Sequence, residues 1–291
     1  MSELIIKTRD ALLEAGTYPK KGLSQNFIIN EEILNKQIEY AQVSDNDIVL
    51  EIGGGTGLLT EKLASVAKRV FCIEYDSNLA KYLINKFKSK NNVTIIEGDA
   101  LKIDFPEANK IVANLPYHIS TPLTFKILDM NFDIAILMYQ YEFARRMVAE
   151  PNSEDYSRLT ANLQYQANVD ILQRVSRGFF YPMPKVDSAI VKITLKKIDL
   201  PVPVEEYRIV SRILFNTKNK IVSSVLYDYF KRRIPKDDRI DFRNLIAEKI
   251  ELSNLRVREL SVDKLVCITK DLSALLSEVN LSELLFKDEK Q

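Results

Sequence analysis

The sequence predicts an α/β protein with a doubly wound, mostly parallel sheet, followed by a smaller all-helical C-terminal domain. Between residues 48 and 193, short β-branched or aliphatic runs alternate with stretches of helical apolar spacing, which is typical of a parallel sheet covered by helices. After residue 195 comes a proline-containing linker, KKIDLPVPVEE. The remaining chain has helical periodicity and no strand pattern. We therefore expect one domain over residues 1–200, including a polar N-terminal arm, and a second over residues 201–291.

The individual elements follow from periodicity. Strands are predicted at 48–52, 69–75, 93–98, 110–114, 132–139 and 188–195. Helices are predicted between them at 57–67, 77–90 and 120–130, the last two with Ser77 and Ser120 as N-caps. In the second domain, helical patterns cover 205–216, 220–230, 242–250 and 262–276.

Composition excludes several classes of protein. A chain of 291 residues with 46% hydrophobic content can bury the core of one large and one smaller domain. No apolar run approaches the roughly 20 residues of a membrane span, and no secretory cleavage pattern follows the N-terminus, so we expect a cytoplasmic protein without a membrane partner. Cys72 and Cys267 lack metal-ligand spacing and His118 is the single histidine, so neither a metal site nor a Ser-His hydrolase is expected. The net charge of +1 means that any basic surface must be local.

A glycine turn follows the first strand of the predicted sheet. Gly53, Gly55 and Gly57 alternate between that strand and a helix, an arrangement that lets a nucleotide-like ligand approach the backbone. A dinucleotide fingerprint requires glycine at the sixth position, where this chain has Leu58, so an NAD site is disfavoured. The turn alone does not identify the ligand.

Acidic residues follow the next two strands. Glu74 and Tyr75 end the second strand, where a carboxylate can accept the hydrogens of two ribose hydroxyls. Asp99 and Ala100 follow the third, where Asp99 can accept a hydrogen bond from an adenine amine. A glycine turn with these two acids suits adenosine carrying a short charged tail, and S-adenosylmethionine fits that description.

The fourth strand ends in Asn114-Leu115-Pro116-Tyr117, the most specific motif in the chain. The amine of adenine is a poor nucleophile because its lone pair is delocalised into the ring. The Asn114 side-chain oxygen and the Leu115 carbonyl can each accept one amine hydrogen and direct the lone pair at a methyl donor. Pro116 fixes this backbone, and Tyr117 offers a ring for base stacking. The motif predicts catalytic residues for methylation of an extruded adenine.

Two further residues near this motif have alternative interpretations. Phe180, in the run Phe179-Phe180-Tyr181-Pro182, is a candidate for the second stacking wall, although ordinary core packing explains it nearly as well. His118 is interpreted as a turn or surface residue because the mechanism needs no general base.

Taken together, these motifs resemble the small-subunit ribosomal RNA adenine dimethyltransferases over nearly the whole chain. The matching stretches are LSQNF, EIGGGTG, GDALK, VANLPYHISTPL, residues 142–146 with YSRL, and FYPMPKVDSAIV. The MYQYEFARRM stretch is more similar to archaeal or eukaryotic members than to bacterial ones. Departures from the family pattern are Ser24 in place of glycine, Gly54 in place of proline and His118 in place of asparagine.

The resemblance implies a Rossmann-like S-adenosylmethionine-dependent methyltransferase with a helical RNA-binding domain. It also implies dimethylation of two adjacent adenines in a hairpin loop of small-subunit ribosomal RNA, and a role in ribosome biogenesis. The arm motif and the strand ends then supply the cofactor contacts. These are Gln25, Asn26, Ile28, Gly53, Gly55, Glu74, Tyr75, Asp99, Ala100 and Asn114.

Basic residues predict where RNA binds. From residue 207 to 243 there are ten Lys or Arg against four Asp, a local excess that suits phosphate contacts, although a solvated helix face of mixed charge is an equally good interpretation without the family. The candidate RNA-binding residues are Lys20, Lys21, Arg145, Arg146, Lys218, Lys220, Lys231, Arg232 and Arg233. The partner is then small-subunit ribosomal RNA or a pre-ribosomal small subunit, bound by a monomer.

Three alternatives stay open. A large-subunit ribosomal RNA methylase of the antibiotic-resistance type shares the catalytic tetrapeptide and the fold. A DNA adenine methylase is disfavoured because no target-recognition insertion interrupts the chain. A ribosome-assembly factor without catalytic activity would keep the fold, but the intact Asn114 and Tyr117 argue for an enzyme.

Overall fold

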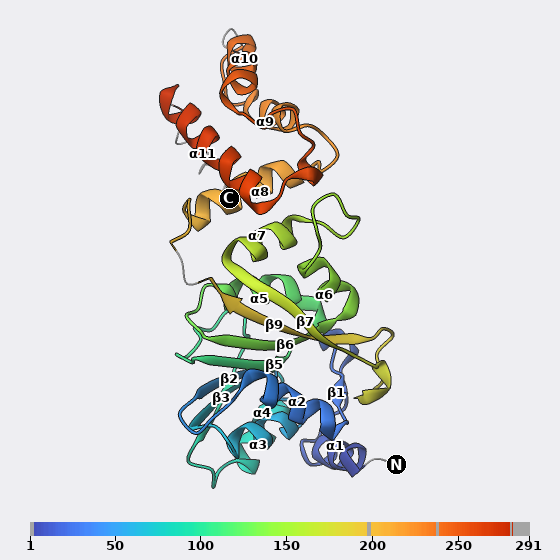
Figure 1. The fold of residues 1–291 in the computed structure, drawn as a ribbon. Helices are drawn as coiled ribbons and strands as arrows, with labels where there is room; N and C mark the ends of the chain where they lie inside the picture. Colours follow the sequence, from blue (N-terminus) through green and yellow to red (C-terminus); the bar gives the residue numbers. More distant parts are fainter. Residues whose placement is uncertain (1–2, 197–198, 237–238, 280, 282–291) are drawn as a thin grey trace. The chain divides into compact units, whose positions relative to one another are not determined.

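The computed structural model describes residues 3–196, 199–236, 239–279 and 281 (Figure 1). Backbone contacts divide the chain into a first unit of residues 1–145 and 167–195, and a second unit of residues 146–166 and 196–291. The single boundary expected near residue 200 is therefore one of three places where the chain passes between units. The reason lies in segment 146–166, whose Tyr165 stacks on Tyr207 at a ring-centroid distance of 3.9 Å and packs in the core of the second unit.

The first unit contains a seven-stranded sheet, which confirms the predicted fold class. Its strands are β2 (Ile48–Ile52), β3 (Arg69–Glu74), β4 (Val93–Glu97), β5 (Lys110–Asn114), β6 (Ile134–Gln140), β7 (Ala167–Val175) and β9 (Ser188–Leu195). Their order across the sheet is β4-β3-β2-β5-β6-β9-β7, and β9 runs antiparallel to both of its neighbours (Figure 1). The strands β2, β3 and β4 follow one another towards one side of the sheet, and β5 and β6 follow one another towards the other side. The switch in strand order therefore falls between β2 and β5. The carboxyl ends of β2, β3, β4 and β5 form the edge where ligands bind in this class of sheet.

Sequence periodicity missed β7. Its sequence, ANVDILQRV, is polar at alternating positions, and a β-bulge between Ile171 and Gln173 interrupts the alternation. A separate two-stranded sheet was also not predicted, in which β1 (Phe27–Ile28) pairs antiparallel with β8 (Phe180–Tyr181). Two-residue strands have no periodicity to detect.

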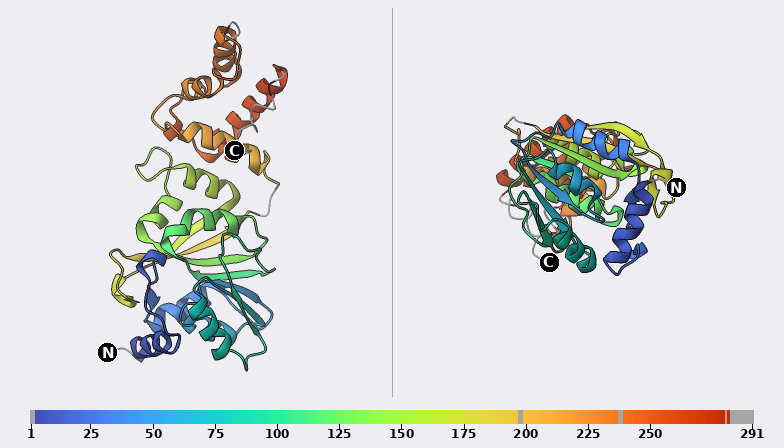
Figure 2. Two further views of the ribbon diagram at one scale, coloured as in Figure 1. Left: turned by 180° about the vertical axis from the view of Figure 1, so that it is seen from behind. Right: turned by 90° about the horizontal axis from the view of Figure 1, so that it is seen from below.

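Helices connect the strands of the first unit. They are α1 (Glu3–Glu14), α2 (Glu31–Ala41), α3 (Leu58–Ala64), α4 (Ser77–Lys86), α5 (Ser120–Leu128) and α6 (Tyr141–Met147), with short 3-10 turns η1 (Lys21–Leu23), η2 (Tyr117–Ile119) and η3 (Arg177–Phe179). The polar arm thus contains a helix of its own, and both views in Figure 2 place α1 beside the β8 segment, where Arg9 lies 5.0 Å from the Tyr181 ring centroid.

Both predicted N-caps are wrong by one residue. The cap of α4 is Asp76, whose carboxylate accepts hydrogen bonds from the backbone N–H groups of Asn78 and Leu79. Ser77 instead donates its hydroxyl to Glu97. Ser120 is the first residue of α5 and follows the cap position at Ile119. Asp76 has the extended backbone typical of an N-cap, whereas Ile119 makes no side-chain cap hydrogen bond.

The second unit is helical over its described residues. It contains α7 (Arg158–Gln166), α8 (Val204–Phe215), α9 (Val222–Phe230), α10 (Arg239–Lys249), η4 (Val257–Glu259) and α11 (Val262–Glu278). Its core joins Tyr156, Tyr165, Tyr207 and Phe230 to aliphatic residues of the surrounding helices. The β pairing described there is one isolated bridge between Ile221 and Arg256. Across the described parts of both units, no helix is long and apolar enough to span a bilayer.

Candidate active site

The turn after β2 has a backbone that demands glycine. Gly53, Gly55 and Gly57 have φ angles of 84°, 56° and 79°, a region that other residues adopt only at a cost. A Cβ atom on Gly55 would lie 3.0 Å from the ring of Phe27, which belongs to the arm. The backbone conformation and the close packing of Phe27 therefore explain the glycines of this turn, and their contact with a ligand stays a prediction.

Glu74 holds this turn in place. Its carboxylate lies at the end of β3, is only 5% exposed, and accepts hydrogen bonds from the N–H of Gly55 at 2.7 Å and of Asp76 at 2.8 Å. Burial raises the pKa of Glu74 above its ordinary value, and the backbone N–H groups of Asp76, Gly55 and Tyr75 oppose that rise. A carboxylate has about four acceptor positions, so acceptor capacity remains for ligand hydroxyls.

Glu51 is a site residue that the sequence reasoning missed. It lies within β2, lines the cavity and is 1% exposed, and its Oε2 has no hydrogen-bond partner among the described residues. Burial raises the pKa of Glu51 to about 8. The signal was available in the sequence, because an acid in the middle of the buried strand IVLEI breaks its apolar pattern. A buried carboxylate with an unpartnered oxygen fits a ligand cation such as an ammonium group.

The loop after β4 brings Asp99 and Ala100 to the same edge. Asp99 accepts a hydrogen bond from the Leu101 N–H at 3.0 Å. Lys126 of α5 fastens the loop by donating to the carbonyls of Ala100, at 2.9 Å, and Ile103. Nothing in the sequence pattern indicated this role for Lys126, because a lysine on a helix is ordinarily solvated.

The N-terminal arm closes over the ends of these strands. Lys20 forms an ion pair with Asp76 at 2.6 Å, and its backbone N–H donates to Gln25 at 2.8 Å. Asn26 donates its side-chain amide to the Ser24 carbonyl at 3.0 Å. Ser24 has a φ of 51°, in the left-handed region that favours glycine. Lys20, predicted to bind RNA, thus forms an ion pair with the residue that caps α4, directly after β3.

The tetrapeptide after β5 faces the glycine turn. The Asn114 oxygen Oδ1 accepts a hydrogen bond from Nε2 of Gln37 at 2.9 Å. The Tyr117 hydroxyl lies 2.6 Å from the Ser188 hydroxyl of β9, and burial raises the pKa of Tyr117. Phe180 is 4% exposed and pairs through its backbone with Ile28 of the arm. Gln37 and Ser188 were not predicted as site residues. Gln37 lies in no motif, and Ser188 lies in the stretch FYPMPKVDSAIV, which by itself predicts no role for this serine.

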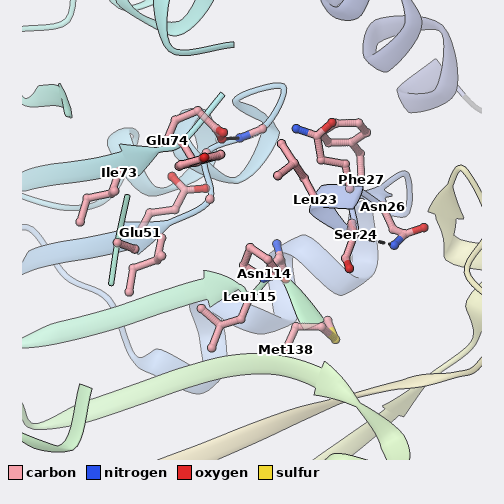
Figure 3. A pocket seen from close by; sticks show the side chains of 18 of the residues that line it. Leu23, Ser24, Asn26, Phe27, Glu51, Ile73, Glu74, Asn114, Leu115 and Met138 are labelled. Atoms are coloured by element: carbon pink, nitrogen blue, oxygen red, sulfur yellow. Dashed lines mark hydrogen bonds between the residues drawn. The ribbon is translucent and has the colours of Figure 1, made fainter. Parts of the chain in front are cut away.

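These groups surround one cavity of about 260 Å³ (Figure 3). In Figure 3, Glu51 and Glu74 lie together on one side, Leu23, Ser24 and Phe27 of the arm on another, and Asn114 between them. Every predicted catalytic and cofactor-binding residue lines this cavity. They are Gln25, Asn26, Ile28, Gly53, Gly55, Glu74, Tyr75, Asp99, Ala100, Asn114, Leu115, Pro116, Tyr117 and Phe180. His118 is exposed and lies at the cavity lining, and the role of each residue in binding stays a prediction.

The predicted RNA-binding cations of the second unit lie in and around α8 and α9. Lys218 donates to the carbonyls of Glu154 and Tyr156, and Lys220 and Lys231 share Asp228 at 3.1 and 2.5 Å. Arg232 is exposed, and Arg233 lies over the ring of Tyr229, 4.1 Å from its centroid. Basic and aromatic side chains therefore alternate here, but several of the cations have protein partners.

The other basic candidates lie at helix ends. Arg145 is exposed and Arg146 half-buried at the end of α6, and these two residues belong to different units. Lys21 begins η1, and its side chain lies outside what the structure describes.

The sheet order, the glycine turn and the acidic strand ends define the chain as an S-adenosylmethionine-dependent methyltransferase. Comparison with known proteins makes this specific. The family model "Ribosomal RNA adenine dimethylase" matches residues 17–261, and the chain belongs to this family. The protein named probable ribosomal RNA small subunit methyltransferase A of Thermococcus sibiricus is 41% identical over 264 residues, which cover 90% of this chain and 94% of the relative. The protein of the same name from Pyrococcus abyssi is 46% identical over 74% of this chain and 78% of its own length.

Two solved structures are similar over most of the chain. A dimethyladenosine transferase from Plasmodium falciparum has a TM-score of 0.73 and 32% identity, covering 88% of this chain and 98% of its own. The 23S rRNA methyltransferase ErmE has a TM-score of 0.63 and 26% identity, covering 85% of this chain and 100% of its own. The large-subunit ribosomal RNA methylases, an alternative that the sequence left open, therefore share this fold.

The cavity residues fit S-adenosylmethionine. The unpartnered Glu51 oxygen suits an ammonium group, and Gly53 and Gly55 line the cavity without a side chain that would fill it. The remaining acceptor positions of Glu74 suit ribose hydroxyls. Within the described residues, no group of three or more His, Cys, Asp or Glu side chains is arranged to hold a metal ion.

Proposed function

We propose that this protein dimethylates the N6 amines of two adjacent adenines in a hairpin loop of small-subunit ribosomal RNA, acting as a monomer in the cytoplasm during biogenesis of the small subunit. One observation carries the proposal. The Asn114–Tyr117 tetrapeptide lines the same cavity as the glycine turn and the acids of β2 and β3. A methyl donor held by the second group is then adjacent to an adenine held by the first.

The acids of the cavity hold the cofactor. Glu74 accepts hydrogen bonds from the ribose hydroxyls, and Asp99 accepts one from the adenine amine of the cofactor. Glu51 pairs with its ammonium group. Gln25, Asn26 and Ile28 close the arm over it, and Tyr75 and Ala100 border the adenine. When bound, the cofactor supplies a sulfonium methyl group that a nucleophile can attack.

The base side activates the target amine. Asn114 Oδ1 accepts one amine hydrogen and the Leu115 carbonyl accepts the other, which turns the nitrogen lone pair out of the ring plane. Pro116, with a φ of −61°, fixes the backbone that presents these two oxygens. Tyr117 and Phe180 stack on the two faces of the base. The methylated amine is acidic enough to lose its extra proton to water, so no side chain acts as a general base.

The RNA is held outside the cavity by basic residues. We assign phosphate contacts to Lys20, Lys21, Arg145 and Arg146, and to the cations around α9, which are Lys218, Lys220, Lys231, Arg232 and Arg233. Each cation that neutralises a phosphate adds about 0.7–0.9 to the slope of log affinity against log salt. Neutralising Lys220, Lys231, Arg232 and Arg233 together should lower RNA affinity and flatten that slope by roughly 3. An unchanged slope would remove the second unit from RNA binding.

A second candidate is methylation of large-subunit ribosomal RNA, which the structural similarity to the 23S rRNA methyltransferase ErmE favours. One experiment separates the two. The protein is incubated with labelled cofactor and either small or large ribosomal subunits that lack methylation, and the modified nucleotides are mapped. Two labelled neighbouring adenines in the small subunit would support the first candidate, and label in the large subunit alone would support the second. No transfer to either would refute both.

A further inference from the structure

We infer that Gln37 of α2 is a positioning residue for methyl transfer, which holds the Asn114 amide in its working orientation through a buried hydrogen bond. This inference rests on the proposed function, because it takes Asn114 as the group that receives the target amine. No motif in the chain marks Gln37, and the inference is drawn from the packing of α2.

Gln37 breaks the apolar face of its helix. The buried residues of α2 are Ile33, Leu34, Gln37 and Ala41, which share the face that packs on β5 and β6. Gln37 is the polar member of this set and is fully buried. Burial of an amide at a core position is unfavourable unless its polar atoms are bonded, so an apolar residue would serve packing better. The hydrogen bond that Gln37 makes is therefore the feature that needs explanation.

That hydrogen bond ends on the proposed catalytic oxygen. Nε2 of Gln37 donates to Oδ1 of Asn114 at 2.9 Å. A side-chain amide oxygen has two lone pairs, so one is used by Gln37 and the other is left for an amine hydrogen of the base. The terminal torsion of asparagine is otherwise broad, and a fixed donor restricts it. Gln37 lies behind Asn114 and outside the set of described residues that line the cavity, so it acts through Asn114.

Gln37 satisfies only half of its own amide. Its Oε1 atom is buried and has no hydrogen-bond partner among the described residues. An unbonded buried oxygen lowers the free energy of unfolding, so an apolar side chain at this position would stabilise the fold more than Gln37 does. The helix that carries it is also fixed at its C-terminal residue, where Lys110 of β5 donates to the Ala41 carbonyl at 2.9 Å. Helix α2 is thus tied to both ends of β5 and gives Gln37 a rigid base.

The test compares Gln37→Met with Ile33→Val, a control among the buried residues of the same helix that, like Gln37, does not line the cavity. Methionine keeps the length of glutamine and cannot donate a hydrogen bond. We expect Gln37→Met to lower kcat by about 10- to 100-fold, as small misplacements of reacting groups do. Its KM and calorimetric Kd for S-adenosylmethionine should stay within about threefold of wild type, and its melting midpoint should be unchanged or higher. Ile33→Val should lower the midpoint slightly and leave kcat unchanged.

A second variant keeps the test decisive if Gln37→Met fails to fold. Gln37→Glu preserves shape, and its carboxylate, once ionised, can only accept a hydrogen bond. Burial raises the pKa of such a carboxyl, so the loss of kcat should grow as the pH rises towards about 9. Compared with wild type at the same pH, it should lose kcat and keep cofactor affinity. Either variant with kcat within about twofold of wild type, or with kcat, cofactor affinity and melting midpoint all reduced together, would overturn the inference. Absence of methyl transfer by the wild-type protein would instead refute the proposed function.

Discussion

The two walls of the cavity are held in different ways. The wall that we propose holds the cofactor, called the cofactor wall, is formed by the glycine turn with Glu51 and Glu74. There the Glu74 carboxylate accepts hydrogen bonds from backbone N–H groups of Gly55 and Asp76. The wall that we propose holds the target base, called the base wall, is formed by residues 114–117 and Phe180. There side chains hold side chains, as Gln37 does with Asn114 and Ser188 with Tyr117. The first wall is therefore part of the fold, and the second depends on a few torsions set by single contacts.

This difference predicts how substitutions divide. A change in the cofactor wall alters the turn itself, so it should affect ligand affinity and stability together. A change in the base wall leaves the backbone in place, so it should affect turnover and little else. The four predictions that follow test this division from the largest expected effect to the smallest.

Asn114→Ala should have the largest effect on turnover. It removes one of the two acceptors for the amine hydrogens, and we expect kcat to fall by about 10²- to 10³-fold, comparable to the loss of a donor that stabilises a transition state. The far-ultraviolet circular dichroism and the melting midpoint should match wild type. A filter assay with labelled cofactor measures the rate, and near-normal turnover would refute the assignment of Asn114.

Glu74→Ala should weaken cofactor binding by about 100-fold or more, because hydrogen bonds to a charged group contribute roughly 1.5–3 kcal/mol and the variant can make neither of the two bonds to the ribose. The variant should also melt at a lower temperature, since the N–H groups of Gly55 and Asp76 lose their acceptor. Calorimetry gives the affinity and a thermal scan the midpoint. Unchanged affinity would remove Glu74 from the site and with it the contrast between the walls.

The sequence predicted the cofactor wall better than the base wall, and the way each wall is held explains the difference. The cofactor wall is built from glycines and acids at strand ends, and both leave a strong local signal. The backbone of Gly55 and the position of Glu74 could therefore be predicted from residue type and strand order. Gln37 and Ser188 could not, because each acts on a residue 77 or 71 positions away and only the fold brings the pairs together.

The elements show the same limit. Strands that are buried on both faces were predicted from their apolar runs, whereas β7 was missed because its bulge breaks the alternation. The division into units was also beyond local periodicity. Segment 146–166 joins the helical unit through contacts such as the stacking of Tyr165 on Tyr207, which are far apart in the sequence.

Glu51→Gln tests the buried acid in β2, on the cofactor wall, through pH. The pKa of Glu51 is about 8 in the folded protein and 4.5 when unperturbed, so the folded state binds the proton more tightly. The contribution of Glu51 to the free energy of unfolding is then constant below pH 4.5, falls as the pH rises towards 8 and is constant above it. Melting midpoints of wild type minus Glu51→Gln, measured from about pH 4 to 9, should decrease across that interval. A flat difference would mean that Glu51 is not neutral in the free protein.

Ser188→Ala should have the smallest effect and gives the finest test of the base wall. It removes the hydroxyl that lies 2.6 Å from the Tyr117 hydroxyl, while the ring of Tyr117 keeps its packing. A neutral hydrogen bond contributes about 0.5–1.5 kcal/mol, so we expect kcat/KM for RNA to fall by about two- to tenfold with cofactor affinity unchanged. Tyr117→Phe should show the same loss, and the double variant should lose no more than either alone, because both remove one contact. Additive losses would mean that the hydroxyls of Ser188 and Tyr117 act separately. The orientation of Tyr117 would then depend on packing, and the contrast between the two walls would not hold for this residue.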